Sequence, residues 1–357
     1  MSSVTYPEVS GKIIVGVDTH KHVHVAVAID QLGVRLDDLV VPVDTGGYRQ
    51  LVEWAREWGE VDAFGVEGTG SYGAGLASYL RRQGLRVVEV NRGDRRARRA
   101  NGKSDTLDAE AAGRAVLNGT ATATPKAADG AAEMIRQIKV ARDTAVKART
   151  SAIITLKALV VNAPADLRES LDGLADKTVI DRCAGFRPGE ITDPTASAKH
   201  ALRATARRWL DLSAEIGSHD TILDDLTEQT APTLREGFGI GADTAAEMLI
   251  IFGDNPDRIR SEAAFAKLCG ACPVPASSGM TNRHRLYWGG HRQANAAIYR
   301  TVIVRMRHHQ PTIDYVKRRT AEGLTKRDII RCLKRFVARE IYQRVMTDHR
   351  SRQQAAA

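Results

Sequence analysis

Four acidic residues stand where secondary-structure elements are expected to begin or end. Asp18 closes one short apolar stretch and Glu67 closes another, while Asp105 and Asp108 lie three residues apart at the expected start of a helix. That spacing puts Asp105 and Asp108 on one face of the helix. Converging carboxylates suit one or two Mg²⁺ ions, which can activate one oxygen and stabilise the leaving oxygen of a phosphoryl group. The four acids are therefore candidate metal ligands and candidate catalytic residues.

Each acid also has a simpler explanation when it is taken alone. Asp105 and Asp108 would favour a helix N-terminus whatever their function, and Asp18 could close a turn. The four acids together, in this order along the expected strands, favour a shared functional site. Without a metal ion, carboxylates so close together would repel one another and their pKa values would rise.

The glycine-rich segment 68–73 offers a competing interpretation. It fits the pattern G-x-G-x-x-G between an expected strand and an expected helix, and Glu89 follows Gly73 by sixteen residues. This is formally a dinucleotide-binding pattern, but it follows three consecutive strands instead of the first strand of a βαβ unit. The glycines have a simpler role, because they free the backbone beside Glu67 so that a metal ion and its substrate can approach.

The elements that must position the acids follow from the apolar pattern. Three consecutive strands are predicted first, with a turn over 30–33, and strands and helices alternate after them. A meander followed by alternating elements predicts a mixed α/β sheet, since an all-parallel sheet would need a helix after its first strand. Ser104 is the expected N-cap of the helix that carries Asp105. The expected strands are 13–18, 23–29, 39–43, 63–67 and 85–90, and the expected helices are 47–58, 72–82 and one that begins near Ser104.

Two later stretches repeat apolar or small residues at four-three spacing, which is typical of helices that pair. They cover 134–159 and 202–226 and enclose an irregular segment with Pro164, Pro188 and Pro194. The pattern predicts a long coiled-coil helical hairpin with an insert at its tip. Its seam of small residues could pair with another subunit, and a plain antiparallel hairpin explains the pattern equally well.

The remaining third of the chain is expected to be mainly helical. A glycine turn over 237–241 leads into a helix over 242–252 and weakly resembles a helix-hairpin-helix, whose backbone N–H groups can meet a phosphate. A helix over 261–269 leads into an expected loop over 273–279, which contains Ser277 and Ser278. These patterns predict three parts, namely residues 1–125, 126–231 and 232–357.

Positive charge is segregated along the chain. Residues 281–357 contain 18 Lys and Arg against 5 Asp and Glu, in a chain whose net charge is +9. Such segregation is typical of binding to a nucleic-acid backbone, although a solvated basic surface or attachment to an anionic membrane would look similar. The candidate nucleic-acid-binding residues are Arg92, Arg95, Arg96, Arg98, Arg99, Lys103, Arg283, Arg285 and Arg292.

Cysteine usage and hydropathy indicate the compartment. The four cysteines fit a reduced cytosolic protein, and Cys269 and Cys272 have metal-ligand spacing but no second pair to complete a site. No apolar run reaches the roughly 18 residues that span a membrane, and no secretory signal precedes the first strand. We therefore expect a cytoplasmic protein that associates with the bacterial nucleoid when it acts.

Two sets of motifs resemble the DEDD-type insertion-sequence transposases, whose N-terminal domain is RuvC-like. The first set is Gly16-Val-Asp18 with His20-Lys21, then Val66-Glu67, then Lys103-Ser-Asp105-Thr-Leu-Asp108-Ala109. The second set is Leu268-Cys-Gly270, Pro273, Ser277-Ser278-Gly279 and Trp288-Gly289-Gly290. The resemblance spans nearly the whole chain and is thinnest between Lys126 and Pro232.

This resemblance implies a ribonuclease-H-like domain with a mixed sheet, a coiled-coil hairpin and a mainly helical C-terminal domain. It also implies that donor and target DNA are cut at a composite of the acidic Mg²⁺ site and a serine that becomes covalently linked to DNA. Ser278 best matches that serine. Ser277 is the alternative, because two adjacent serines allow the match to the family motif to be shifted by one residue. The resemblance further implies a structured guide RNA, and a homodimer or tetramer in which a Mg²⁺ ion held by Asp18 and Glu67 of one subunit helps to deprotonate the serine of another.

Three other classes of protein share part of this pattern. A RuvC-like junction resolvase would use the same acids with water as the nucleophile, but it leaves the Ser-Ser-Gly segment and the basic C-terminus without a role. A non-catalytic nucleic-acid-binding protein would not need all four acids. An actin-like ATPase or sugar kinase also begins with a Gly-x-Asp strand, but no second phosphate loop is evident.

Overall fold

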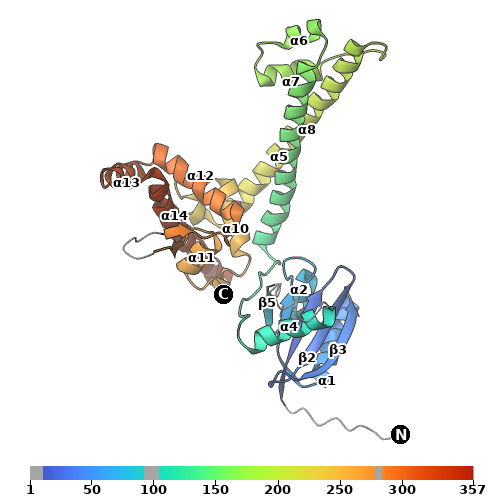
Figure 1. The fold of residues 1–357 in the computed structure, drawn as a ribbon, viewed down its shortest axis with the longest axis vertical. Coiled ribbons are helices and arrows are strands. Elements are labelled where there is room, and N and C mark those ends of the chain that lie inside the picture. Colours follow the sequence, from blue (N-terminus) through green and yellow to red (C-terminus); the bar gives the residue numbers. More distant parts are fainter. Residues whose placement is uncertain (1–10, 92–103, 278–283, 357) are drawn as a thin grey trace. The chain divides into compact units, whose positions relative to one another are not determined.

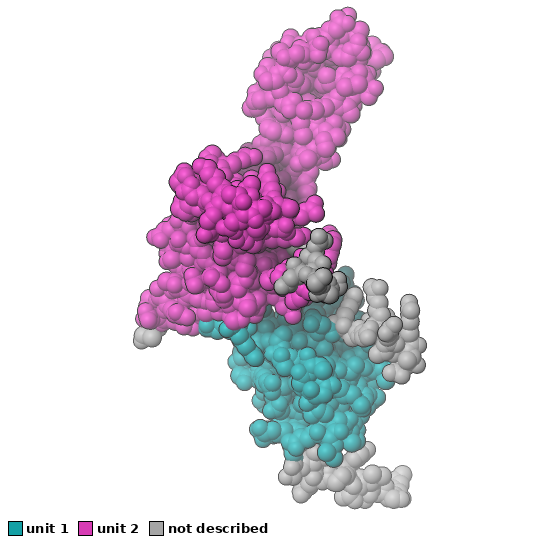
Figure 2. Space-filling view, turned by 60° about the vertical axis from the view of Figure 1, so that its left-hand side comes forward, with its two compact units in different colours: residues 1–130, 252–260 teal, residues 131–251, 261–357 magenta. Residues whose placement is uncertain are grey.

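The computed structural model describes residues 11–91, 104–277 and 284–356 and forms two compact units. The first unit contains residues 1–130 and 252–260, and the second contains residues 131–251 and 261–357 (Figures 1 and 2). The expected division into three parts stays a prediction.

The first unit is built on a five-stranded mixed sheet in the order β3-β2-β1-β4-β5. β2 is antiparallel to both β1 and β3, whereas β4 is parallel to both β1 and β5. The predicted meander and mixed sheet are confirmed, and a doubly wound parallel sheet is excluded. The strands are β1 (Lys12–Thr19), β2 (Val23–Ile29), β3 (Arg35–Pro42), β4 (Glu60–Glu67) and β5 (Val87–Val90).

Helices cover both faces of this sheet (Figure 1). Successive residues of a strand point to opposite faces, so the apolar strands present side chains for packing on both sides. Val15 and Val17 belong to a buried cluster with side chains of helices α1 (Thr45–Glu57) and α2 (Ala74–Arg82). Ile14, on the other face, belongs to a second cluster with side chains of α4 (Asp105–Leu117). The apolar residues of β1 therefore contribute to two buried clusters, one on each face of the sheet. Helix α4 packs against the face opposite the one that α1 and α2 cover.

Two long antiparallel helices, α5 (Ala131–Val161) and α8 (Pro194–Thr230), form the hairpin of the second unit. Arg142 Nε lies 2.5 Å from Asp220 Oδ1, and further along α5 Arg149 meets Ser213, which lies earlier in α8. Small residues of the predicted seam, including Ala145 and Ala152, are buried. The helical pair agrees with the sequence pattern, whereas supercoiling and pairing between subunits stay predictions.

The tip of the hairpin differs from the irregular segment that was expected. It contains two short helices, α6 (Ala165–Leu171) and α7 (Asp176–Ala184), whose apolar residues share a core with the ends of α5 and α8. Pro164 is the N-cap of α6, and Pro194 is the first residue of α8. The prolines were interpreted as marks of irregular chain, but a proline at a helix start is favourable because no N–H is needed there.

The C-terminal part of the second unit is mainly helical, as expected. The 242–252 helix is present as predicted, and Ser261 caps the helix that follows it, accepting a hydrogen bond from Ala264 N at 3.2 Å. No helix among the described residues has the length and apolar character needed to cross a membrane. The helices are α9 (Pro232–Arg235), α10 (Ala242–Phe252), α11 (Glu262–Leu268), α12 (Arg292–His308), α13 (Gln310–Ala321) and α14 (Lys326–Ala356).

The expected loop over 273–279 was partly wrong. β6 (Pro273–Pro275) pairs antiparallel with β7 (His284–Leu286), with Val274 opposite Arg285. Pro273 and Pro275 have no N–H to donate to a partner strand. A short strand with a single partner tolerates them, since each proline can still accept a hydrogen bond.

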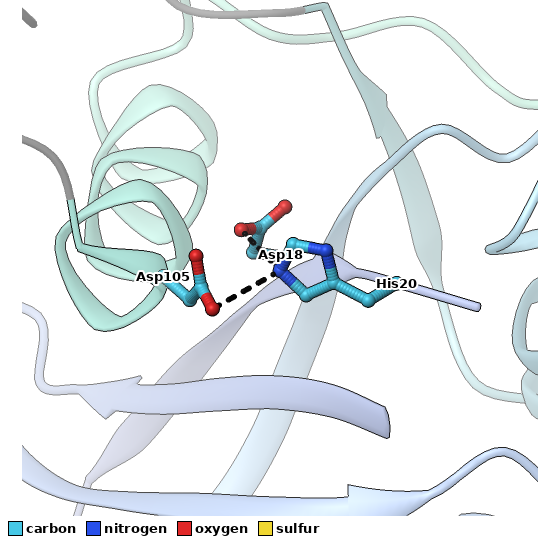
Figure 3. Close-up of side chains that lie close together, drawn as sticks. All are labelled: Asp18, His20 and Asp105. Carbon is cyan, nitrogen blue, oxygen red and sulfur yellow. Dashed lines mark ion pairs between the residues drawn. The ribbon is translucent and has the colours of Figure 1, made fainter. Parts of the chain in front are cut away.

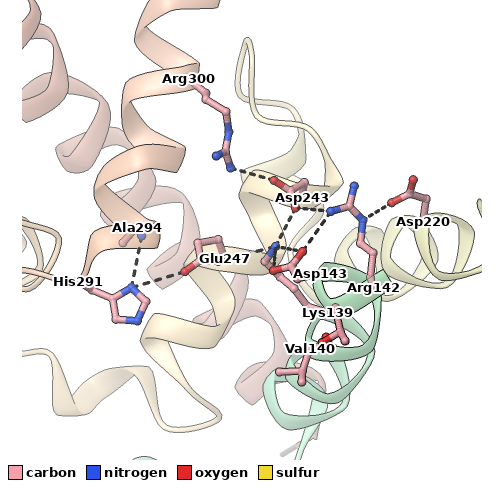
Figure 4. Close-up of polar contacts among 11 residues, drawn as sticks. Lys139, Val140, Arg142, Asp143, Asp220, Asp243, Glu247, His291, Ala294 and Arg300 are labelled. Atoms are coloured by element: carbon pink, nitrogen blue, oxygen red, sulfur yellow. Dashed lines mark hydrogen bonds and ion pairs between the residues drawn. The ribbon is translucent and has the colours of Figure 1, made fainter. Parts of the chain in front are cut away.

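A charged network joins the hairpin to helices α10 and α12 of the second unit (Figure 4). Lys139 Nζ donates to Asp243 Oδ1 at 2.8 Å, and Arg300 donates to the other oxygen of Asp243 at 2.9 Å. Arg142 lies between Asp243 and Asp220. Burial alone would raise the pKa of Asp243, but the hydrogen bond and charge of Lys139, with the charges of both arginines, hold it below its usual range. The network therefore links α5, α8, α10 and α12.

Glu247 extends this network toward the start of α12. Its side chain is buried, with one oxygen 3.8 Å from Lys139 Nζ and the other 3.6 Å from His291 Nδ1. Burial raises the pKa of Glu247. His291 is also the N-cap of α12, where its ring accepts from Ala294 N (Figure 4).

Candidate active site

Asp18 and Glu67 come from neighbouring parallel strands and lie at the same end of the sheet. The last aligned pair of β1 and β4 is Val17 with Val66, so the two acids follow one residue beyond it on each strand. The Thr19 hydroxyl donates to the carbonyl oxygen of Glu67 at 2.8 Å, which ties the two strand ends together. Asp18 is 8% exposed. The strand order thus brings together two carboxylates that are 49 positions apart in the chain.

Helix α4 brings the other two acids to the same place. The Ser104 side chain accepts from Leu107 N at 3.2 Å, so α4 begins where the sequence predicted, and Asp105 and Asp108 occupy its first turn. Asp108 lines the same cavity as Asp18 and Glu67. Asp105 lies close enough to Asp18 for its charge to act on that carboxylate, so two acids from strands and two from a helix meet at this end of the sheet.

Glycines allow α4 to lie directly on the sheet. A Cβ at Gly16 would stand 1.9 Å from the carbonyl oxygen of Ala109 and 2.3 Å from the amide nitrogen of Gly113. A Cβ at Gly65, on the next strand, would stand 2.7 Å from Val116 Cγ2. These contacts leave no room for a side chain, so the glycines determine how close Asp105 and Asp108 come to Asp18.

Replacing Gly16 with Ala should destabilise the first unit, since the new methyl group would meet backbone atoms of α4 that cannot move aside alone. Overpacking of this kind costs about 1–3 kcal/mol, and the backbone contact puts Gly16→Ala at the upper end. Thermal unfolding measures the change. Gly70→Ala is the matched control, because Gly70 has open space around it, and equal melting temperatures for the two variants would contradict this packing.

His20 lies between two of the acids (Figure 3). Its Nε2 is 3.2 Å from Asp18 Oδ2 and 3.3 Å from Asp105 Oδ2. His20 belongs to the motif that carries the resemblance, but the sequence assigned it no role. Its type and its place two residues after Asp18 could have marked it as a further ligand or as a charge partner of the acids.

The acids line an open cavity of about 400 Å³ at the end of the sheet. Besides Asp18, Glu67 and Asp108, its walls include Tyr72 from the glycine-rich segment and Glu89 from β5. Glu89 was weighed as the acid of a dinucleotide pattern, whereas here it faces the same cavity as the other carboxylates. Gly68 has a φ of +70°, which turns the chain sharply after Glu67 and keeps the cavity open.

The electrostatics of this site favour a divalent cation. Burial raises the pKa of Asp18, the charge of His20 opposes the rise, and the charges of Asp108 and Asp105 add to it. Asp18, His20 and Asp105 each offer one ligand atom, and these atoms lie within 4.8 Å of one another. Hard carboxylate oxygens with a nearby imidazole suit Mg²⁺ or Mn²⁺, so the residues fit a divalent metal ion.

The other predicted residues belong to different parts of the chain. Arg285 lies exposed on β7, Arg292 is the exposed first residue of α12, and Ser277 is exposed after β6. Arg285 and Arg292 belong to the second unit, whereas the four acids belong to the first. The predicted residues that lie outside the described residues are Arg92, Arg95, Arg96, Arg98, Arg99, Lys103, Ser278 and Arg283.

Comparison with known families gives two matches along the chain. Residues 15–163 match a DEDD-type IS110 family described as transposase, and residues 231–317 match the transposase IS116/IS110/IS902 family. A search of curated proteins gives no match. The DEDD match covers all four acids and implies the use of a divalent metal, and the mixed sheet with its helices fits a ribonuclease-H-like domain of this type. The chain belongs to the IS110 family of transposases and is a DNA transposase, an enzyme that recombines DNA.

Proposed function

We propose that this transposase cuts and rejoins the DNA strands of a mobile element by metal-dependent phosphoryl transfer, with a serine as the nucleophile. The observation that supports this most directly is the convergence of Asp18, Glu67, Asp105 and Asp108 at one end of the sheet. Isolated caps or turn residues would have no reason to meet there. Burial raises the pKa of Asp18 against the charge of His20, and the charges of Asp108 and Asp105 add to the rise, an unfavourable arrangement that a bound cation would offset.

The four acids would hold one or two Mg²⁺ ions, with His20 between Asp18 and Asp105. When bound, Mg²⁺ lowers the pKa of an attacking oxygen and stabilises negative charge on the leaving oxygen. Asp18, which is nearly inaccessible to solvent, would fix the position of the ion. The open side of the cavity would admit the DNA backbone beside Gly68 and Tyr72.

Ser278 is the proposed nucleophile. Its hydroxyl oxygen would bond to a DNA phosphorus as the bond from phosphorus to a deoxyribose oxygen breaks, and the serine proton would leave with that oxygen. A second DNA hydroxyl would then reverse the exchange, which conserves the phosphodiester for rejoining. The acids and the serine belong to different units, so we propose that acids from a partner subunit of a dimer or tetramer complete the site.

We further propose that a structured RNA selects the donor and target DNA. This proposal comes from the resemblance to the family and from the segregated positive charge of residues 281–357. The basic residues from Arg92 to Lys103, together with Arg283, Arg285 and Arg292, would hold the RNA and DNA backbones through charge and counterion release.

Removing divalent metal should abolish recombination. Labelled donor and target DNA are incubated with protein, structured RNA and Mg²⁺, and the strands are separated on a denaturing gel. Because a catalytic metal contributes several kcal/mol of charge stabilisation, chelation should slow strand exchange by roughly a thousandfold, and added Mg²⁺ should restore it. Undiminished exchange after chelation would contradict the metal mechanism, and nicked strands that never rejoin would instead favour a junction resolvase that uses water.

A further inference from the structure

The second unit contains a cavity of about 870 Å³ that the proposed chemistry does not use. Its walls come from the link between α11 and β6, from β7, and from helices α13 and α14. The β6–β7 hairpin that forms one wall also leads into the segment with Ser277. One wall of the cavity therefore comes from the two strands that flank the candidate nucleophile in the sequence.

Cations predominate among the residues around this cavity. Arg285, Arg327, Arg331, Lys334 and Arg335 line it, and Asp328 is the only acidic residue among the described lining residues. Asp328 pairs with Arg331 at 3.1 Å, and Glu262 pairs with Arg335 at 2.9 Å from outside the lining. Arg285 and Arg327 form no ion pair within the described part of the chain. The remaining positive charge favours an anionic ligand.

Lys334 gives an independent indication of the same ligand. The residue is 8% exposed, and its ammonium group donates to the Asn295 side-chain oxygen. Among the described residues no carboxylate lies within ion-pair distance of it, and the charge of Arg331 lies close by. Burial, followed by the charge of Arg331, lowers the pKa of Lys334. A buried cation without a counter-ion is unfavourable, and a phosphate in the cavity would supply one.

Two aromatic residues also line the cavity. Tyr315 and Phe336 pack edge to face with ring centroids 5.5 Å apart, and both rings line the cavity. Phe336 is 48% exposed although it is a large apolar side chain. Aromatic rings beside a group of cations are the combination on which an unpaired base stacks while its phosphate is held by charge.

We propose that this cavity binds one unstacked nucleotide of a single DNA strand, with its base against Tyr315 and Phe336 and its phosphate facing Lys334 and Arg331. We expect the nucleotide to come from DNA, because the candidate nucleophile lies in the sequence between β6 and β7, which form one wall of the cavity. This choice rests on the proposed function. The binding itself requires neither metal nor strand cleavage. The cavity would hold one nucleotide of the strand on the unit whose sequence carries the candidate nucleophile.

The experiment uses the full-length protein without metal and a short single-stranded DNA in which one thymine is replaced by 5-iodouracil. After irradiation, mass spectrometry should locate the adduct on Tyr315 or Phe336. Phe336→Ala should weaken binding of the DNA strand about tenfold, because one base loses the ring on which it stacks. Arg331→Gln should weaken it about as much, the loss of a charge-assisted contact.

Arg339→Gln is the matched control. Arg339 lies on the same helix, carries the same charge and pairs with Glu262, but it does not line the cavity, so this variant should bind within about twofold of wild type. Arg331 and Phe336 are exposed, and thermal unfolding checks that their variants fold. Adducts confined to other residues, or equal weakening by Arg331→Gln and Arg339→Gln, would overturn the site.

A parallel probe in RNA distinguishes the source of the nucleotide. Adducts with the DNA probe support the proposal, and adducts with the RNA probe alone would overturn the assignment to DNA. Strand exchange without any adduct in this cavity would overturn this inference and leave the proposed function intact. Adducts without strand exchange would support the cavity and contradict the proposed function.

Discussion

Replacing Asp18 with Asn should reduce strand exchange by roughly a thousandfold or more, the several kcal/mol that a catalytic metal provides. Asn has nearly the same shape but lacks the negative charge that attracts Mg²⁺. Asp18 is the most buried of the four acids, and both Asp105 and Asp108 act on its pKa, so its charge is central to the site. The assay is strand exchange on labelled donor and target DNA with Mg²⁺.

The same variant should not lose stability without metal. Burial raises the pKa of Asp18 above its ordinary value of 3.8, so the ionised carboxylate is unfavourable in the folded state at neutral pH. That penalty is absent below pH 3.8, where the group is protonated in both states, and it develops as the pH rises through the folded-state pKa. Asp18→Asn removes the penalty, so its melting temperature at pH 7 should equal or exceed that of wild type.

Two comparisons complete this test. Mg²⁺ should raise the melting temperature of wild type but not that of Asp18→Asn, because only the intact site binds the ion. Asp62→Asn is the matched control, since Asp62 lies near the other end of β4 and pairs with Arg86 at the surface, and it should keep its activity. An Asp18→Asn protein that exchanges strands at the wild-type rate would remove Asp18 from the metal site.

Replacing Ser278 with Ala should abolish the covalent link between protein and DNA. The variant lacks the hydroxyl that would form the phosphoserine bond, so no adduct can arise, whereas binding of DNA needs only the cations of the chain. Protein, Mg²⁺, structured RNA and labelled DNA are incubated and denatured, and the fraction of label that migrates with the protein is measured. Wild type should show the adduct and Ser278→Ala should show none.

Ser277→Ala is the natural control, because the neighbouring serine has the same chemistry and differs only in position. It should keep the adduct. A reversed result, with Ser277 essential and Ser278 dispensable, would move the nucleophile by one residue. Adducts in both variants and in the double variant would contradict the serine mechanism, and strand cleavage without any adduct would favour water as the nucleophile.

Much of the first unit could be predicted from local pattern. Three apolar runs in succession predicted the meander, and the short turn after Asp30 predicted an antiparallel return. Ser104 predicted the start of α4 because a serine at an N-cap satisfies free N–H groups at the first turn. The small residues of 134–159 likewise predicted the long helix α5. In each case the signal and the structure that it predicts lie within a few residues.

The sequence was a poorer guide where pairing or packing at a distance decides the conformation. Pro273 and Pro275 suggested a loop, yet β7 pairs with them from beyond the serine segment. The segment between the long helices looked irregular, yet α6 and α7 fold because their apolar residues find a shared core at the hairpin tip. Short helices owe their stability mainly to such packing and little to their own propensity.

By itself, the sequence determined the types and order of the chemical groups, namely four acids in a fixed order, a Ser-Ser-Gly segment and a basic C-terminus. Only the tertiary structure decided that the acids meet, since this requires β4 to add beside β1 and glycines at positions 16 and 65 to admit α4. The position of His20 between two acids, and the cationic cavity beside the β6–β7 hairpin, depend on the same kind of long-range packing. Residue spacing predicts which residues are neighbours within one helix or strand. A site assembled from several elements depends on backbone contacts between those elements, which no local pattern predicts.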